Sequence, residues 1–153
     1  MALIALPYDI EGLTSRVLFE DEFQLACNKS HPLAGEKAVS IGSLADQPLM
    51  LLEKGHCPRG HALNACQLHH GQERAQFEAS SLHTLVQVVG AGIGVTLLPK
   101  LAIDAQIARE TNIQLIPLAY VASRQVGLVW RQSSLRTQEF EVLGDTLGRV
   151  VNG

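Results

Sequence analysis

Residues 80–99, SSLHTLVQVVGAGIGVTLLP, join a helix pattern to a strand pattern in one continuous stretch. Ser80 or Ser81 is placed to cap the helix through its hydroxyl group. Four apolar residues then recur at the spacing that gathers side chains on one helix face: Leu82, Leu85, Val86 and Val89. Two glycines end the helix, an apolar strand follows over 93–97, and a proline turns the chain. This order predicts an α/β fold.

Short apolar strands alternate with amphipathic helices along the rest of the chain, which is also typical of an α/β fold. The expected strands are 2–6, 16–27, 49–52, 75–79, 114–118 and 125–131, and the expected helices are 40–44, 58–70, 100–108 and 135–150. The chain opens with one isolated strand, and QVGLVW (125–130) precedes the last helix as if it returned to a sheet begun earlier. We therefore expect two α/β lobes, with the first lobe only partly present.

The composition allows a buried core and argues against direct binding of nucleic acid by this segment. Of the 153 residues, 46% are hydrophobic and 18% are charged, and the formal net charge is −3. Duplex binding normally needs a clustered basic surface, and the sequence has no long run of Lys or Arg. The apolar residues 1–6 lack the basic start of a secretory signal, so we expect a strand there and a cytoplasmic location.

Structural disulfides are rare in the cytosol, so the three cysteines need another explanation. Cys27 lies within a strand-like apolar run and is expected to be a small buried side chain. The other two, Cys57 and Cys66, lie in LEKGHCPRGHALNACQLHH (52–70), which also holds four of the six histidines.

Cys57 stands where a thiolate would be stabilised. Pro58 is favoured at the first position of a helix, which makes Cys57 the cap, with its sulfur at the positive end of the helix dipole. Arg59 adds a positive charge and His56 can donate a hydrogen bond. Because the thiolate is the species that attacks peroxides, these neighbours predict a reactive cysteine.

Cys66 follows Cys57 by nine residues, which creates a geometric conflict. In a continuous helix the two Cα atoms would be roughly 13 Å apart and on opposite faces. A disulfide requires Cα atoms within about 4.4–6.8 Å. If the two cysteines join, the helix must therefore unwind or move, as in a redox switch.

A metal site is the competing use of the same residues, because two cysteines and several histidines could bind zinc or copper. The common zinc modules use close Cys-x2–4-Cys and His-x3–5-His pairs, and that spacing does not occur here. His69 and His70 are adjacent and would point apart on a helix. We therefore expect no metal and no other cofactor.

Two motifs carry a resemblance to a known family. SSLHTLVQVVGAGIGVTLLP (80–99) and RQVGLVWR (124–131) resemble the effector-binding domain of LysR-type transcriptional regulators. GHCPRGHALNAC (55–66) is more specific and resembles the hydrogen-peroxide sensors within that family. The resemblance covers about residues 2–150 and implies a two-lobe fold like that of periplasmic binding proteins.

The resemblance also implies roles for individual residues. Cys57 would be the peroxidatic cysteine and Cys66 the resolving one, and His56 and Arg59 would line the peroxide pocket. Disulfide formation would then rearrange the subunits of a homo-oligomer (a dimer or tetramer in the full-length protein). It would thereby change contacts to promoter DNA and RNA polymerase, and a glutaredoxin or thioredoxin would restore the thiols. The resemblance further implies that the protein is not an enzyme and has no membrane partner. It favours activation of transcription over repression.

The family pattern also implies boundaries. Residues 1–20 would be part of lobe I, 21–118 would be lobe II with the redox cysteines, and 119–153 would return to lobe I. The family's helix-turn-helix domain and the first β-α-β portion of lobe I are expected to lie outside this sequence. So are threonines that the family uses to help bind peroxide.

Two other functions remain open. A thiol peroxidase would use Cys57 and Cys66 in the same chemical roles but needs efficient re-reduction. An effector domain for another small molecule would instead use polar groups at a helix start, for which the candidates are Ser80, Ser81 and Thr84. Arg124 and Arg131 are candidate interface residues, with strand-end charges or packing within a lobe as the simpler interpretation.

Overall fold

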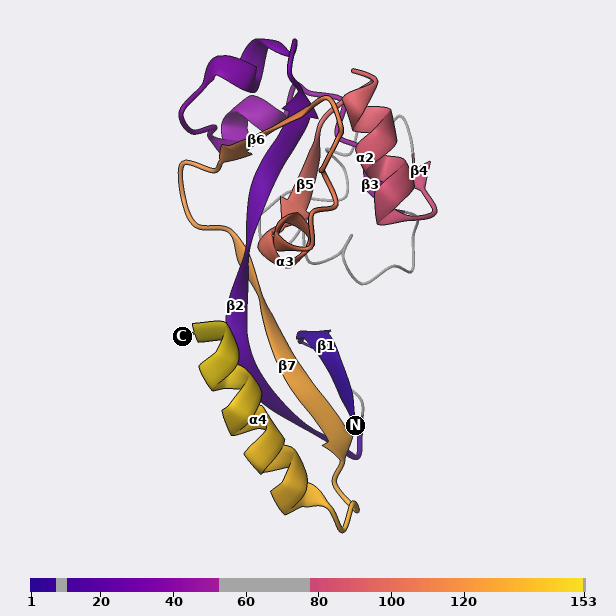
Figure 1. The fold of residues 1–153 in the computed structure, drawn as a ribbon, viewed down its shortest axis with the longest axis vertical. Coiled ribbons are helices and arrows are strands. Elements are labelled where there is room, and N and C mark those ends of the chain that lie inside the picture. The colour runs from indigo at the N-terminus through magenta and orange to yellow at the C-terminus, as the bar shows by residue number, and fades with distance from the viewer. Residues whose placement is uncertain (8–10, 53–77, 153) are drawn as a thin grey trace. The chain divides into compact units, whose positions relative to one another are not determined.

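A computed structural model describes residues 1–7, 11–52 and 78–152 of the chain. The fold is α/β, and it divides into two compact units (Figure 1). Unit 1 comprises Met1–Asp21 and Arg124–Gly153, and unit 2 comprises Glu22–Ser123. The chain therefore crosses between the units twice, after Asp21 and after Ser123. Within the described ranges, no helix is both long enough and apolar enough to cross a bilayer.

Unit 1 is built on strand β7 (Ser123–Arg131), which lies between β1 (Ala2–Leu6) and β2 (Leu13–Asn28). β1 and β7 are antiparallel, with a register that runs from Ala2 opposite Val129 to Leu6 opposite Gln125. The centre of β7, residues 126–130, is buried throughout. A strand covered on both faces needs a continuous apolar run, which explains the sequence VGLVW at this place.

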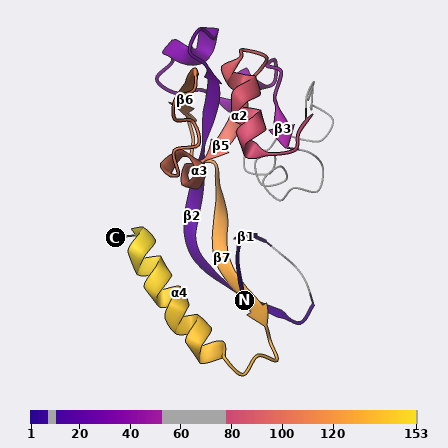
Figure 2. The same cartoon turned by 45° about the vertical axis from the view of Figure 1, so that its right-hand side comes forward.

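Helix α4 (Thr137–Asn152) runs beside β2 in both views of the chain (Figures 1 and 2). The Phe140 ring of α4 lies 5.9 Å from the Trp130 ring of β7, measured between centroids. Two side chains of opposite charge also join the helix to β2, because Arg16 forms an ion pair with Asp145. These contacts hold α4 against the sheet of unit 1.

Unit 2 is centred on the second part of β2, which pairs antiparallel with β5 (Thr96–Pro99) and with β6 (Ile113–Pro117). Alternate residues of β2 face opposite sides of this sheet. Leu25 and Cys27 belong to one buried cluster, together with Leu44 of the short helix η2 (Ile41–Leu44). Ala26 belongs to a second cluster, formed with helix α2 (Leu82–Gly90). Apolar residues in unit 2 thus cover both faces of its sheet.

Smaller elements complete unit 2. The short helix η1 (Pro32–Gly35) follows β2, and α3 (Lys100–Asp104) follows β5. β3 (Leu51–Leu52) and β4 (Glu78–Ala79) form a separate parallel pair. A hydrogen bond of 2.8 Å from the hydroxyl of buried Thr96 to the carbonyl of Met50 joins β5 to the residue before β3.

Several expected elements differ in extent from the observed ones. The strand expected at 93–97 begins at Thr96, because Gly92 adopts a positive φ of 83° and the turn continues past Ile93, which is 54% exposed. The helix expected at 100–108 ends at Asp104, and Gln106 has a φ of 62°. The short helix η1 was not among the expected elements. The helix expected at 58–70 and most of the strand expected at 75–79 lie outside the described residues.

Candidate functional site

The four residues of the predicted redox site, His56, Cys57, Arg59 and Cys66, lie outside the described residues. The elements on both sides of them are described. β3 ends at Leu52 and β4 begins at Glu78, and the two strands pair in parallel, with Leu51 opposite Glu78 and Leu52 opposite Ala79. The two described strands that flank the segment with the two cysteines are therefore parallel neighbours.

Both ends of this connection are anchored in the core. Leu51, Leu52 and Ala79 are buried, and the two latter pack in the same cluster as Leu85 and Val86 of α2. The backbone N–H of Met50 donates a hydrogen bond of 2.8 Å to the carbonyl of Val95. A displacement of β3 or β4 would therefore change their packing contacts with α2 and the hydrogen bond to the residue before β5.

The start of α2 holds the three residues proposed as an alternative ligand site. The Ser81 hydroxyl accepts a hydrogen bond of 3.1 Å from the backbone N–H of Thr84, and it lies 3.0 Å from the Thr84 hydroxyl oxygen. Ser81 is thus the N-cap of α2, and it is one of the two serines expected to cap this helix. Ser80 is exposed and precedes the cap. This geometry accounts for Ser81 and Thr84 by helix capping.

Cys27 is a buried thiol in the core of unit 2. Its exposed fraction is 0%, and burial raises the pKa of the thiol above the ordinary value. A raised pKa favours the protonated form, which reacts poorly with peroxides. The prediction that Cys27 is a buried side chain is therefore confirmed.

The two arginines proposed as interface residues differ in their surroundings. Arg124 forms an ion pair with Asp21 inside unit 1, with side chains that are 12% and 1% exposed. Arg131 is exposed at the end of β7. For Arg124, the structure shows a contact within unit 1, which agrees with the simpler interpretation of packing within a lobe.

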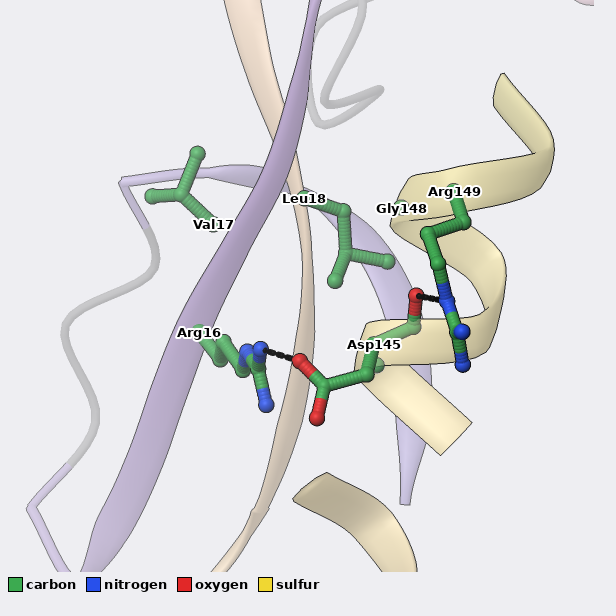
Figure 3. Close-up of a pocket in the computed structure, with 7 residues that line it drawn as sticks. Arg16, Val17, Leu18, Asp145, Gly148 and Arg149 are labelled. Carbon is green, nitrogen blue, oxygen red and sulfur yellow. Dashed lines mark hydrogen bonds and ion pairs between the residues drawn. The ribbon is translucent and has the colours of Figure 1, made fainter. Parts of the chain in front are cut away.

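An open groove lies in unit 1 between β2 and α4, with a volume of about 500 Å³ (Figure 3). Two interactions join residues of its lining: Arg16 forms an ion pair with the Asp145 carboxylate, and Arg149 Nε donates to the backbone carbonyl of Asp145 at 3.3 Å. Val17, Leu18, Gly144 and Gly148 form the rest of its lining. No sequence motif indicated this groove, because its residues are far apart in the chain and individually ordinary.

Metal binding has no support among the residues that the structure describes, since no three His, Cys, Asp or Glu side chains gather there. The histidines between 56 and 70 lie outside that part of the chain.

Comparison with known proteins identifies the fold family. The LysR substrate binding domain matches residues 1–152. The chain belongs to this family.

Curated relatives of this LysR domain are transcription regulators. A probable hydrogen peroxide-inducible genes activator of Mycobacterium avium is 39% identical over 99% of this chain and 49% of its own length. The regulator OxyR of Escherichia coli is 33% identical over 99% of the chain and 50% of its own length. The regulator EstR of Acinetobacter baylyi is 37% identical over 98% of the chain and 50% of its own length. This LysR domain thus spans about half the length of these relatives.

Solved structures of the same kind match the fold. The reduced regulatory domain of OxyR2 from Vibrio vulnificus gives a TM-score of 0.85 at 38% identity, over 96% of this chain and 70% of that one. The reduced OxyR regulatory domain of Pseudomonas aeruginosa gives 0.78 at 31% identity, over 95% and 70%. The two-lobe α/β fold of the LysR regulatory domain, expected from the sequence, is confirmed by these matches. The assignment of residues 1–20, 21–118 and 119–153 to particular lobes stays a prediction.

Proposed function

We propose that the chain is the regulatory part of a LysR-type transcription regulator that responds to hydrogen peroxide. The observation that carries this proposal is the motif GHCPRGHALNAC at 55–66 in a chain that is 33–39% identical to hydrogen peroxide-inducible genes activators. The pattern at 80–99 is typical of the whole LysR family and therefore does not distinguish a peroxide sensor from its other members. The paired cysteines are what point to redox sensing.

The chemistry follows from the neighbours of the first cysteine. The Cys57 thiolate attacks one oxygen of hydrogen peroxide, the O–O bond breaks, and the other oxygen leaves as water after protonation. Cys57 then carries a sulfenic acid, which condenses with the Cys66 thiol to form a disulfide and a second water. His56 and Arg59 polarise the O–O bond and stabilise the negative charge on the leaving oxygen.

The described part of unit 2 supports a route from that disulfide to the rest of the fold. The connection between Leu52 and Glu78 begins and ends on paired strands, and its anchors pack against α2. Interiors are close-packed, so a shift of Leu52 or Ala79 is passed to their neighbours rather than absorbed. In the full-length protein this change alters the homo-oligomer and its contacts with promoter DNA and RNA polymerase, and a glutaredoxin or thioredoxin reverses it.

The test is titration of the reduced chain with hydrogen peroxide, followed by mapping of disulfides by peptide mass spectrometry. We expect a stoichiometric Cys57–Cys66 link. Cys57→Ser should abolish it, and Cys66→Ser should leave a sulfenic acid on Cys57 that a dimedone probe captures. Cys27→Ser is the matched control and should form the link at the normal rate. A link that persists in Cys57→Ser would show that another residue reacts with peroxide.

A second candidate is an effector domain that binds a different small molecule. The chain is about as similar to EstR, at 37% identity, as to OxyR of Escherichia coli, at 33%, so overall similarity does not choose between these regulators. Thiols that stay reduced at excess peroxide, in this chain and in one extended to the full regulatory domain, would favour this candidate. Rapid multiple turnover with a thioredoxin system would instead indicate a thiol peroxidase.

A further inference from the structure

Asp21 and Arg124 occupy the two places where the chain leaves and re-enters unit 1. Asp21 is the last residue of the first segment of unit 1, and Arg124 is the first residue of the second. Arg124 donates hydrogen bonds from both Nε and Nη2 to Asp21 Oδ2, at 2.9 and 2.8 Å. Both side chains are largely removed from water, with 12% and 1% of their surface exposed.

Contacts on either side of the ion pair continue the same antiparallel order, between β2 on one side and β7 with the residue before it on the other. On one side of the ion pair, the Gln125 side-chain amide donates to the Glu20 carboxylate at 3.1 Å. On the other side, the backbone N–H of Phe23 donates to the carbonyl of Ala122 at 2.8 Å. The two chain crossings are therefore bonded to each other as a ribbon rather than running as separate linkers.

We propose that the Asp21–Arg124 ion pair is a latch that makes these two crossing strands open and move together. The adjacent side-chain contact, Gln125 with Glu20, is exposed, and exposed polar pairs hold strands weakly. The buried pair is directional, because a planar guanidinium fork must meet one carboxylate oxygen. A rearrangement within residues 22–123, which include Cys57 and Cys66, then reaches unit 1 through both strands at once. The inference goes beyond the proposed function, and the latch itself requires no peroxide.

The test is hydrogen–deuterium exchange of the reduced chain and of the double variant Asp21→Leu/Arg124→Met. Replacing a buried ion pair by apolar side chains of similar size generally preserves stability, so the variant should fold and keep its urea midpoint. Without the directional bond, we expect amides of 18–23 and 122–127 to exchange at least about tenfold faster. Exchange in α2 and α4 should not change. If the ion pair only stabilised the fold as a whole, its loss would lower the urea midpoint and would not accelerate exchange at the crossings alone.

Two further variants make the result decisive. Gln125→Ala removes the adjacent exposed contact and should leave exchange at 18–23 unchanged. Arg124→Lys keeps the charge but loses the fork, and it should accelerate exchange at the same amides by a few fold, even if the double variant fails to fold. Unchanged exchange at the crossings in Arg124→Lys, or acceleration spread equally over α4, would overturn the latch.

Discussion

The backbone of Gly94 approaches the carbonyl oxygen of Pro48 so closely that a side chain has no room between them. A Cβ atom built on Gly94 would stand 2.4 Å from that oxygen and 2.8 Å from the terminal methyl of Met50. The next residue, Val95, donates its N–H to the same Pro48 carbonyl at 3.1 Å. The contact places the stretch before β5 directly against the chain that leads into β3.

We predict that Gly94→Ala destabilises the chain by roughly 1–3 kcal/mol, because a backbone carbonyl cannot move aside as a flexible side chain can. Urea unfolding followed by far-UV circular dichroism measures the change. Gly35→Ala is the matched control: a Cβ there meets nothing within 4 Å, so its effect should stay within about 1 kcal/mol. Equal losses at both positions would contradict the role of the Gly94 contact.

Replacing the cap of α2 should weaken the helix at one serine and not at its neighbour. Ser81 accepts the N–H of Thr84, so Ser81→Ala should cost about 1 kcal/mol of unfolding free energy. Ser80→Ala should change it by less than about 0.5 kcal/mol, because Ser80 is exposed and is not the cap. Chemical denaturation of both variants measures the difference, and a larger loss at Ser80 would contradict the observed cap.

The sequence located α2, β1, β2 and β7 because their signals are local. The cap at Ser81 and the apolar spacing up to Val89 are complete within ten positions, and α2 begins and ends close to where they indicate. The early end of α3 could not be predicted, since it depends on a positive φ at Gln106, a residue type that gives no turn signal. Local pattern likewise misplaced the start of β5, which depends on how the turn at Gly92 is packed.

Relationships between distant residues were beyond the sequence. Arg124 was recognised as notable, but nothing in its neighbourhood identified Asp21, 103 positions away, as its partner. The groove between β2 and α4 was missed for the same reason. Conversely, the cysteine motif was visible only in the sequence, because its residues fall outside the described ranges.

Gly148 in α4 offers a stabilising substitution. A Cβ at this position would meet no atom closer than the Leu18 carbonyl oxygen at 3.9 Å. Glycine within a helix costs about 0.5–1 kcal/mol relative to alanine, so Gly148→Ala should stabilise unit 1 by about that amount. Gly144→Ala should gain less, because its Cβ would come within 3.3 Å of the Arg16 side chain, which is held by Glu141 and Asp145. Thermal unfolding of the two variants compares them, and a larger gain at Gly144 would contradict this packing.

Cys27 should make the stability of the fold fall at alkaline pH. Burial raises the pKa of its thiol, whereas the unfolded chain has an ordinary thiol pKa of about 8.5. Between those two values the folded state keeps the proton and the unfolded state releases it. The stabilisation from burying the neutral thiol is therefore complete below about pH 8.5 and is lost as the pH rises through the folded-state pKa.

This prediction is best measured in a Cys57→Ser/Cys66→Ser background, where Cys27 is the remaining thiol. Urea midpoints under reducing conditions should fall more steeply from pH 7.5 to pH 10 in that protein than in the same background with Cys27→Ala. The two proteins differ only at residue 27, so the contributions of all other groups cancel in the comparison. Cys27→Ala should be less stable at neutral pH because it leaves a small cavity, and its disadvantage should shrink as the pH rises. A constant difference across the whole range would mean that the Cys27 thiol ionises equally easily in the folded and unfolded states.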